Sequence, residues 1–322
     1  MYIGIVMFLG NNGVDMLTYV DGSLFLSPAK VLVNTVNIVG VMGKGIAKDF
    51  KTYFPEMFRE YQLRCESNAL EIGKLYLYRS PNKWILNFPT KKHWRHPSKP
   101  EYIEEGLKAF VAGYARNGIT SIAFPRLGCG NGELDWATRV RPLMEQYLSA
   151  LPIDVFVHHF RSETAKPEHL EIERTKRWLR SEPENLNFDE VWEDITAMIG
   201  TERVFQSVTG ARPFTVRTVD SPELGLQLVD SESTFIPQES LLETWQNLRS
   251  TGFLSARSLV DGLDLHANQV MALFASLPYV RLTHLSQSKS GKLEEYSDAI
   301  QFVPREKKHP AGPHEVHEAS QS

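Results

Sequence analysis

Residues 33–47 read VNTVNIVGVMGKGIA, an apolar run that gives way to a glycine-rich turn. The run is typical of a buried strand, and the turn is placed to open a helix. Glycines let backbone N–H groups approach a phosphate, and the first turn of a helix favours an anion. A tight turn without a ligand is the alternative. The loop is not of the Walker type, because Gly45 follows Lys44, and it lacks the third glycine of a dinucleotide fingerprint.

Residues 124–132, FPRLGCGNG, form a second loop in the same setting, after an expected strand and before an expected helix. Two such loops at the ends of sheet strands can hold the two sides of a pyrophosphate, which is a stronger indication than either loop alone. Cys129 could be a nucleophile. No histidine stands in a recognisable partner motif, so we favour a small residue packed in the loop.

Short β-rich runs alternate with amphipathic helices between residues 17 and 158. This alternation predicts an α/β fold whose sheet is covered by helices on both faces. A helix is expected over residues 101–117, where apolar side chains fall on one stripe. A second helix is expected over residues 135–149, directly after the second glycine loop. Strands are expected over residues 17–20, 31–36, 75–78, 84–88, 121–124 and 153–158.

Composition narrows the class of protein. The chain has 322 residues, a hydrophobic fraction of 42% and a formal net charge of -4. That length predicts a mid-sized domain with smaller companions, and the near-neutral charge leaves any nucleic-acid contact to a local basic patch. The two cysteines, Cys65 and Cys129, exclude a disulfide framework and a cysteine-based zinc site, which favours a reducing cytoplasm. No apolar run is long enough to cross a bilayer, so no membrane association is expected.

Five segments are expected along the chain. Residues 1–15 are interpreted as a leader or a misassigned start before Met16, and residues 16–160 as the α/β domain. The charged stretch 161–187 is a predicted linker, with a helix around residues 170–179. Residues 188–304 form a smaller α+β region that opens with an amphipathic helix over 188–199, and the charged tail 305–322 is expected to be disordered.

The C-terminal part of that region has the pattern of a winged helix. Helices are expected over residues 239–249, 255–263 and 266–276, followed by strands over 279–284 and 296–303. Strands are also expected over 214–218 and 224–229, as a pair. The third helix carries no Arg or Lys between Asn268 and Phe274, so strong DNA contact there is not expected, and a protein-binding or dimerising role is preferred.

The string NFPTKKHWR at residues 87–95, with GCGNG at 128–132 and LDW at 134–136, resembles the macrodomains that bind ADP-ribose. It is most similar to the DNA ADP-ribosyl glycohydrolases, the antitoxins of the DarT–DarG type. The resemblance implies a three-layer α/β/α macrodomain with a mixed sheet. It implies an enzyme that hydrolyses the N-glycosidic bond between ADP-ribose and thymidine in DNA. The enzyme would act as antitoxin to a DNA ADP-ribosyltransferase toxin that its C-terminal region binds. No cofactor is expected, and no metal site is evident among the residues.

The resemblance also implies site residues. Lys91 matches the family's catalytic lysine, and Asn37 matches the asparagine beside the distal ribose. ADP-ribose is expected to contact Asn37, Met42, Gly43, Lys44, Gly45, Ile46, Ala47, Thr90, Leu127, Gly128, Cys129, Gly130, Asn131 and Gly132. Two positions depart from relatives: Ser23 stands where many macrodomains have an adenine-binding aspartate, and Gly132 stands where the related eukaryotic hydrolase has a catalytic aspartate.

Lys91 could act in two ways on the bond from ribose to the thymine ring nitrogen. A neutral amine could attack the anomeric carbon and form a Schiff-base-type adduct after ring opening. A charged amine could stabilise the departing base or orient the phosphates. The first route needs a lowered pKa, for which Lys92 is a neighbouring like charge and Phe88 and Trp94 could remove water. A solvated surface lysine is the alternative.

The segment that follows Lys91 is basic and contains an aromatic residue. Lys92 and Arg95 suit backbone phosphates and Trp94 suits stacking on an exposed base, so these three are expected to contact single-stranded or flipped-out DNA. A charged surface loop with a buried Trp is the alternative. For the whole chain, the competing functions are a non-catalytic ADP-ribose-binding module and a DNA-binding antitoxin or repressor.

Overall fold

The computed structural model describes residues 17–159, 166–210, 212–230, 232–259, 262–289 and 292–304. It divides into two compact units: the first contains the chain up to Arg180 together with Asn185–Val191, and the second contains Ser181–Glu184 and the chain from Trp192 onward. The expected leader, residues 1–15, and the expected tail, residues 305–322, lie outside the described residues.

The first unit is built on a mixed six-stranded sheet of order β1-β6-β5-β2-β4-β3. Its strands are β1 (Leu17–Val20), β2 (Val31–Asn37), β3 (Tyr76–Arg79), β4 (Trp84–Lys91), β5 (Ser121–Pro125) and β6 (Asp154–His158). Only β3 runs antiparallel to its neighbour, and the other pairs are parallel. The expected strands are therefore confirmed, although β4 continues to Lys91, beyond the expected end at residue 88.

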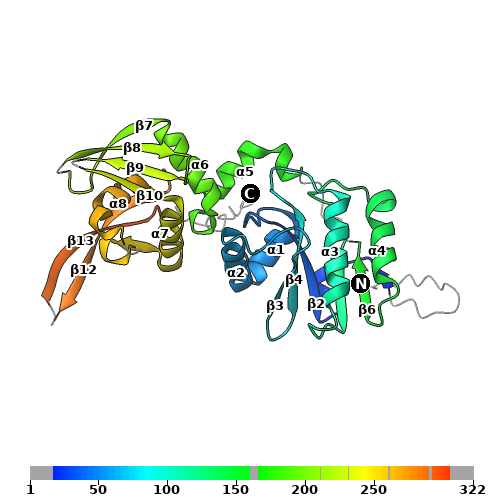
Figure 1. Ribbon diagram of the computed structural model, residues 1–322. Coiled ribbons are helices and arrows are strands. Elements are labelled where there is room, and N and C mark those ends of the chain that lie inside the picture. The colour runs from blue at the N-terminus through cyan, green and yellow to red at the C-terminus, as the bar shows by residue number, and fades with distance from the viewer. Residues whose placement is uncertain are drawn as a thin grey trace, which may run out of the picture. The chain divides into compact units, whose positions relative to one another are not determined.

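Helices cover both faces of this sheet (Figure 1). One face packs on α3 (Pro100–Gly113) and α4 (Arg141–Leu148), which follows the π-helical turn η2 (Trp136–Val140). The other face packs on α1 (Gly45–Tyr53) and α2 (Pro55–Glu66). The alternation along β2 shows why: Val31 and Val33 enter the first core, whereas Leu32 and Val36 enter the second. The three-layer α/β/α architecture with a mixed sheet is thus confirmed.

The predicted linker, residues 161–187, is different in the structure. Its described part contains η3 (Glu168–Leu170), α5 (Ile172–Arg180) and η4 (Pro183–Asn185), and most of it belongs to the first unit. Glu168, Thr175 and Leu179 are buried there, which a free linker would not show. The many charged residues of this stretch suggested full exposure to solvent, but one face of it is buried. The boundary between the units falls inside α6 (Phe188–Ile199), after Val191.

The second unit contains two antiparallel sheets. A four-stranded sheet of order β10-β9-β8-β7 is formed by β7 (Glu202–Gln206), β8 (Pro213–Val219), β9 (Gly225–Val229) and β10 (Ser233–Pro237). After α7 (Gln238–Thr251) come β11 (Phe253–Ser255), η5 (Ala256–Ser258), η6 (Asp264–His266), α8 (Ala267–Ala275), β12 (Val280–Lys289) and β13 (Lys292–Phe302). The second sheet has the order β11-β13-β12.

One expected element of the second unit is wrong. The helix predicted over residues 255–263 is, among its described residues, the end of β11 followed by the short turn η5. Leu254 is buried and pairs with Ile300 of β13, so pairing in the sheet takes precedence over the local helical pattern. The pairing expected between the strands over 214–218 and 224–229 is confirmed by β8 and β9.

Candidate active site

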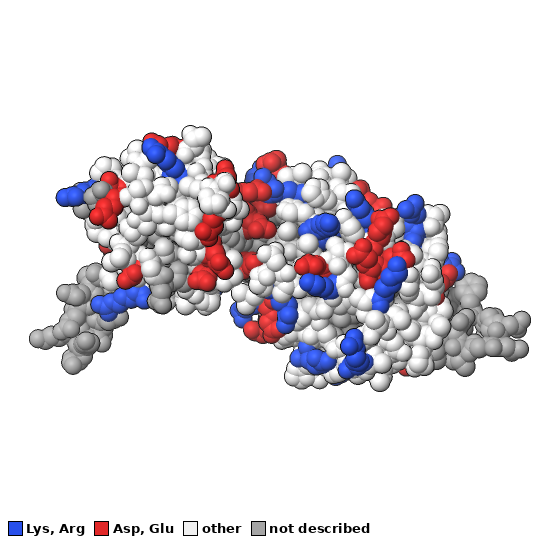
Figure 2. Space-filling view, in the orientation of Figure 1, with Lys and Arg blue, Asp and Glu red and all other residues white. Residues whose placement is uncertain are grey.

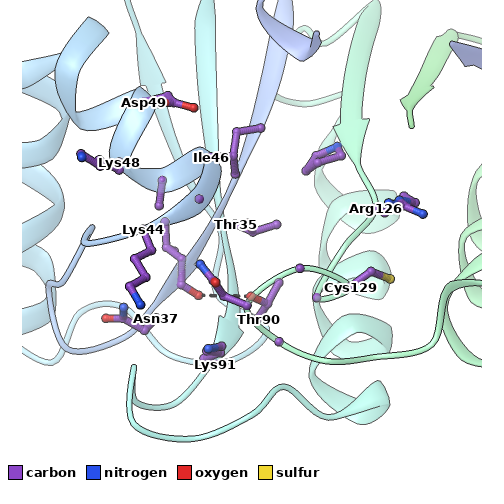
Figure 3. A pocket seen from close by; sticks show the side chains of 18 of the residues that line it. Thr35, Asn37, Lys44, Ile46, Lys48, Asp49, Thr90, Lys91, Arg126 and Cys129 are labelled. Carbon is purple, nitrogen blue, oxygen red and sulfur yellow. Dashed lines mark hydrogen bonds between the residues drawn. The ribbon is translucent and has the colours of Figure 1, made fainter. Parts of the chain in front are cut away.

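A pocket opens where the parallel strands of the first unit end. Its volume is about 680 Å³, and its lining includes Asn37, Lys91, Pro125 and His158, the last residues of β2, β4, β5 and β6. Ligands of open α/β sheets bind outside the carboxyl ends of the strands, where strand order reverses. Figure 3 shows Thr90 and Lys91 between the side that carries Asn37 and Lys44 and the side that carries Cys129.

Most residues expected to hold ADP-ribose lie together around this pocket. The residues of that set that line it, together with the expected catalytic residue Lys91, are Asn37, Gly43, Lys44, Gly45, Ile46, Ala47, Thr90, Gly128, Cys129, Gly130, Asn131 and Gly132. Met42 and Leu127 are not among the lining residues, because their side chains point into the two cores. A contact with ADP-ribose at these two positions would have to come from the backbone, and it stays a prediction. The function of the others in ADP-ribose binding stays a prediction.

The first glycine loop is braced by Asn37. The Asn37 Oδ1 accepts hydrogen bonds from the amides of Val39 and Val41 and from the Tyr61 hydroxyl, and its Nδ2 donates to the Val41 carbonyl at 2.7 Å. Gly45 has a φ of +57°, in the region that favours glycine, and begins α1. The loop thus presents the N-terminus of α1 to the pocket, where the helix dipole favours a phosphate. Much of the Asn37 amide is used in holding this loop.

The second glycine loop leaves no room for a side chain at Gly132. A Cβ atom there would lie 2.3 Å from the Ser98 Oγ and 2.4 Å from the Gly128 carbonyl oxygen. The aspartate that the related eukaryotic hydrolase has at this place could not be accommodated without moving the loop. The pocket therefore has no lysine–aspartate pair built on this position.

We expect Gly132→Asp to disturb the loop rather than create a second catalytic group. Overpacking at a site with backbone on one side should lower the free energy of unfolding by about 1–3 kcal/mol, measured by thermal or denaturant unfolding. Gly130→Ala is the matched control, since nothing lies within 4 Å of a Cβ atom at Gly130. A Gly132→Asp protein as stable as the wild type would contradict this view of the loop.

Lys91 is brought to the pocket by an irregular strand end. The register between β2 and β4 shifts between Val36 and Asn37, so that Val36 pairs with Pro89 and Asn37 pairs with Lys91. Successive side chains of a regular strand point to opposite faces, and a bulge re-aims them. Thr90 and Lys91 both line the pocket as a result. The sequence pattern predicted that this strand ends at residue 88, so it could not show that Thr90 and Lys91 both face the pocket.

The Lys91 amine is withdrawn from water. The residue is 6% exposed, and its Nζ has no hydrogen-bond partner among the described residues. Burial lowers the pKa of Lys91, and the nearby carboxylates of Glu168 and Glu133 oppose that shift. The alternative of a solvated surface lysine is therefore wrong. A buried amine with a lowered pKa has a larger neutral fraction at a given pH, which is the form that acts as a nucleophile.

Cys129 lines the pocket, yet its thiol is poorly suited to nucleophilic attack. Burial raises the pKa of Cys129 to about 12, so the thiolate is scarce at neutral pH. The Sγ lies 3.4 Å from the Leu127 carbonyl oxygen, to which it donates. Both observations favour the small packed residue over the nucleophile.

The three expected DNA contacts do not form one surface. Trp94 is fully buried, and its Nε1 donates to Glu190 at 3.2 Å, so it cannot stack on an exposed base. Arg95 pairs with the same carboxylate. Lys92 is exposed, near the ring of Tyr102. The stacking function expected for Trp94 is wrong, because its large apolar area gains more from burial in the core than from exposure.

Some residues of the pocket were not expected from the sequence. Glu168, from η3, lines it and is buried, although its own stretch of sequence contains no motif. His158 also lines it and approaches the Gly22 carbonyl through Nδ1 at 3.2 Å. Ser23 and Phe25 lie in the lining too. Of these four residues, only Ser23 could be singled out from the sequence, because it stands after the first strand where many macrodomains have an aspartate.

The described residues bring together no group of three or more His, Cys, Asp or Glu side chains that could hold a metal ion. Among the helices of the described chain, none has the length and apolar character needed to span a membrane. The pocket brings together two glycine turns, the buried amine of Lys91 and the buried carboxyl group of Glu168.

Two glycine turns lie around the pocket where the parallel strands end. Residues 33–142 match the family model described as Macro domain. This part of the chain is therefore a macrodomain.

Several curated relatives are described as DNA ADP-ribosyl glycohydrolases. The chain is 47% identical over 148 residues to a DNA ADP-ribosyl glycohydrolase of Thermus aquaticus, a match that covers 44% of this chain and 41% of the relative. It is 39% identical over 173 residues to a DNA ADP-ribosyl transferase–DNA ADP-ribosyl glycohydrolase fusion protein of Thermosipho africanus, covering 47% and 44% of the two chains. The resemblance to the DarG type is thus confirmed.

Solved structures include the macrodomain of Thermus aquaticus DarG, with 47% identity and a TM-score of 0.43, covering 45% of this chain and 99% of that one. The chain spans less than half the length of the curated relatives named above, at 41% and 44%. The similarity concerns the macrodomain, and the rest of the chain stands outside it.

Proposed function

We propose that this protein is a DNA ADP-ribosyl glycohydrolase that removes ADP-ribose from thymidine and so acts as antitoxin to a DNA ADP-ribosyltransferase. One observation carries the proposal: a buried amine, Lys91, faces a pocket formed by two glycine turns. The turns supply amides for the diphosphate, and the amine is placed for the ribose carbon that is attacked. The names of the relatives support the substrate class.

The test is release of ADP-ribose from a defined substrate. A single-stranded oligonucleotide with ADP-ribose on one thymidine is incubated with the protein, and free ADP-ribose and the restored oligonucleotide are quantified by mass spectrometry. We expect both products in equal amounts. Calorimetric binding of ADP-ribose with an intact modified oligonucleotide after long incubation would instead favour a non-catalytic ADP-ribose-binding module.

We propose that DNA reaches the pocket as a single strand or a flipped-out nucleotide, since a base inside a duplex could not enter it. Lys92 remains the candidate for a backbone phosphate contact because it is exposed next to Lys91. In Figure 2 positive and negative side chains are interspersed on the visible face of the first unit. A local contact fits this surface better than broad electrostatic attraction.

We propose that residues 188–304 bind the toxin, and that residues 239–304 form a winged-helix-like module within this region. The order α7, β11, α8, β12, β13 and the sheet order β11-β13-β12 support the module, with a short turn where its second helix would lie. In α8, Val270–Phe274 is buried and Asn268 is exposed, which leaves little of the helix for reading DNA bases. Protein binding is therefore favoured over a repressor function.

The division into an ADP-ribose-binding domain and an interaction region is part of this proposal. The first was predicted over residues 16–160 and takes in most of residues 166–191 in the structure; the second lies within residues 188–304. So is a reducing cytoplasm as the place of action, which the free thiols of Cys65 and Cys129 support.

A further inference from the structure

The segment after the macrodomain match supplies one wall of the pocket. The match ends at residue 142, and η3 lies beyond it. The segment is tied to both glycine turns. Glu171 pairs with Lys44 of the first turn at 2.7 Å, and His169 lies 2.6 Å from Glu133 beside the second. Because the segment is held at both glycine turns, the position of Glu168, the residue before His169, is fixed beside the pocket.

The Glu168 carboxyl group is buried against the first turn. It is 6% exposed and lines the pocket together with Lys91. Its Oε1 would lie 3.0 Å from a Cβ atom built on Gly43, which places the carboxyl group directly against the first turn. Among the lining residues two carry carboxylates, Asp49 and Glu168, and Asp49 is exposed. Glu168 is thus the carboxyl group placed with the amine inside the pocket.

We propose that Glu168 is the acid–base catalytic residue of the glycohydrolase, an inference that rests on the proposed function. As a carboxylic acid it donates its proton to the thymine as the bond from the ring nitrogen to the anomeric carbon breaks, and the bonding electrons stay with the base. As a carboxylate it then takes a proton from the water whose oxygen bonds to that carbon. The products are thymidine and ADP-ribose, and the acid is restored.

The surroundings of Glu168 suit both states. Burial raises the pKa of Glu168. The charges of Lys91 and Lys44 oppose this shift, and so does the nearby backbone amide of Lys44. The hydroxyl of Tyr61 also faces this region, and burial raises its pKa, so it adds no charge near neutral pH. Lys91 and Glu168 interact, so the two apparent pKa values in a rate profile belong to the pair.

The sign of the pH dependence follows from these states. The first step needs protonated Glu168, so the kcat/KM of the wild type should fall as pH rises through the upper apparent pKa. Glu168→Gln cannot ionise and should lose that fall. It should also slow cleavage by about 100-fold or more, the usual contribution of a general acid–base group. Single-turnover cleavage of the modified oligonucleotide, measured across pH, provides both readouts.

Two further measurements separate chemistry from structure. Calorimetry should show ADP-ribose binding to Glu168→Gln within about threefold of the wild type, a change of less than about 1 kcal/mol. With ADP-ribose carried on 5-fluorouracil, a base that leaves more readily, the defect of Glu168→Gln should shrink to about tenfold or less. Glu173→Gln, an exposed carboxylate on the neighbouring helix α5, is the matched control and should behave as the wild type.

The outcomes are distinct. If Glu168→Gln cleaves at the wild-type rate, or loses binding in proportion to its rate, or keeps the fall at high pH, Glu168 is not the acid–base residue and the proposed function stands. If the wild type itself releases no ADP-ribose, both the proposed function and this assignment are overturned.

Discussion

Replacing Lys91 by alanine is expected to reduce the rate of ADP-ribose release from DNA by about 10³-fold or more, the effect of removing a group on which the chemistry depends. The amine is 6% exposed and lacks a hydrogen-bond partner within the described chain, so it has no evident structural function to lose. ADP-ribose binding should persist, because the two glycine turns remain. Single-turnover kinetics with the modified oligonucleotide and calorimetry with ADP-ribose measure the two effects.

Lys91→Arg distinguishes the two possible functions of the amine. A guanidinium stays charged at any working pH and is a poor nucleophile, so it can replace an electrostatic contribution but not an attacking amine. Activity as low as that of Lys91→Ala would favour attack at the anomeric carbon. Partial activity would favour stabilisation of the departing base.

Lys108→Ala serves as the control for these variants. Its side chain is 58% exposed on α3, where it pairs with Glu104. Lys108→Ala should cleave like the wild type. A Lys91→Ala protein with full activity would exclude Lys91 from the mechanism and with it the proposed route of hydrolysis.

Replacing Glu190 by alanine is expected to lower the free energy of unfolding of the first unit by about 3–5 kcal/mol, because it removes one partner of a buried ion-pair network. The Glu190 side chain is 1% exposed. It accepts hydrogen bonds from Trp94 at 3.2 Å and from Arg180 at 3.3 Å, and it pairs with Arg95. For a unit of this size the melting temperature should fall by roughly 6–20 °C.

Calorimetric melting measures the effect, and two variants interpret it. Glu190→Gln keeps the size of the side chain and one acceptor oxygen, so a smaller loss than with alanine would assign the difference to packing and hydrogen bonding rather than charge. Glu56→Gln is the control, since Glu56 pairs with Arg59 on the surface with 67% of its side chain exposed. Surface pairs contribute about 0–1 kcal/mol. A Glu190→Ala protein that melts like this control would contradict the network's importance.

The network also explains how the segment after Lys91 is held. Trp94 and Arg95 follow the end of β4, and both contact Glu190 of α6. The basic and aromatic residues of this segment suggested a surface that binds nucleic acid. In the structure they tie the end of β4 to a helix nearly one hundred positions later, a separation of 96 residues for Trp94 and Glu190.

The sequence by itself determined the macrodomain. The apolar runs and glycine turns along residues 17–158 carry local information, because a strand, a turn and a helix each depend on neighbouring residues. The same holds for the string around Lys91, whose side chain could be identified before its surroundings were known. The two cores follow from the alternation of β2 and the apolar stripes of the helices, whereas the order of the strands came from the structure.

Only the tertiary structure decided which polar residues share the pocket. Glu168 lies in a charged stretch without a motif, and its proximity to Lys91 depends on ties to Lys44 and Glu133 from distant parts of the chain. The burial of Trp94 and of one face of the predicted linker likewise became evident only in the tertiary structure. Burial and the pairing of charges are properties of the assembled fold, since each depends on what packs against a residue rather than on its neighbours along the chain.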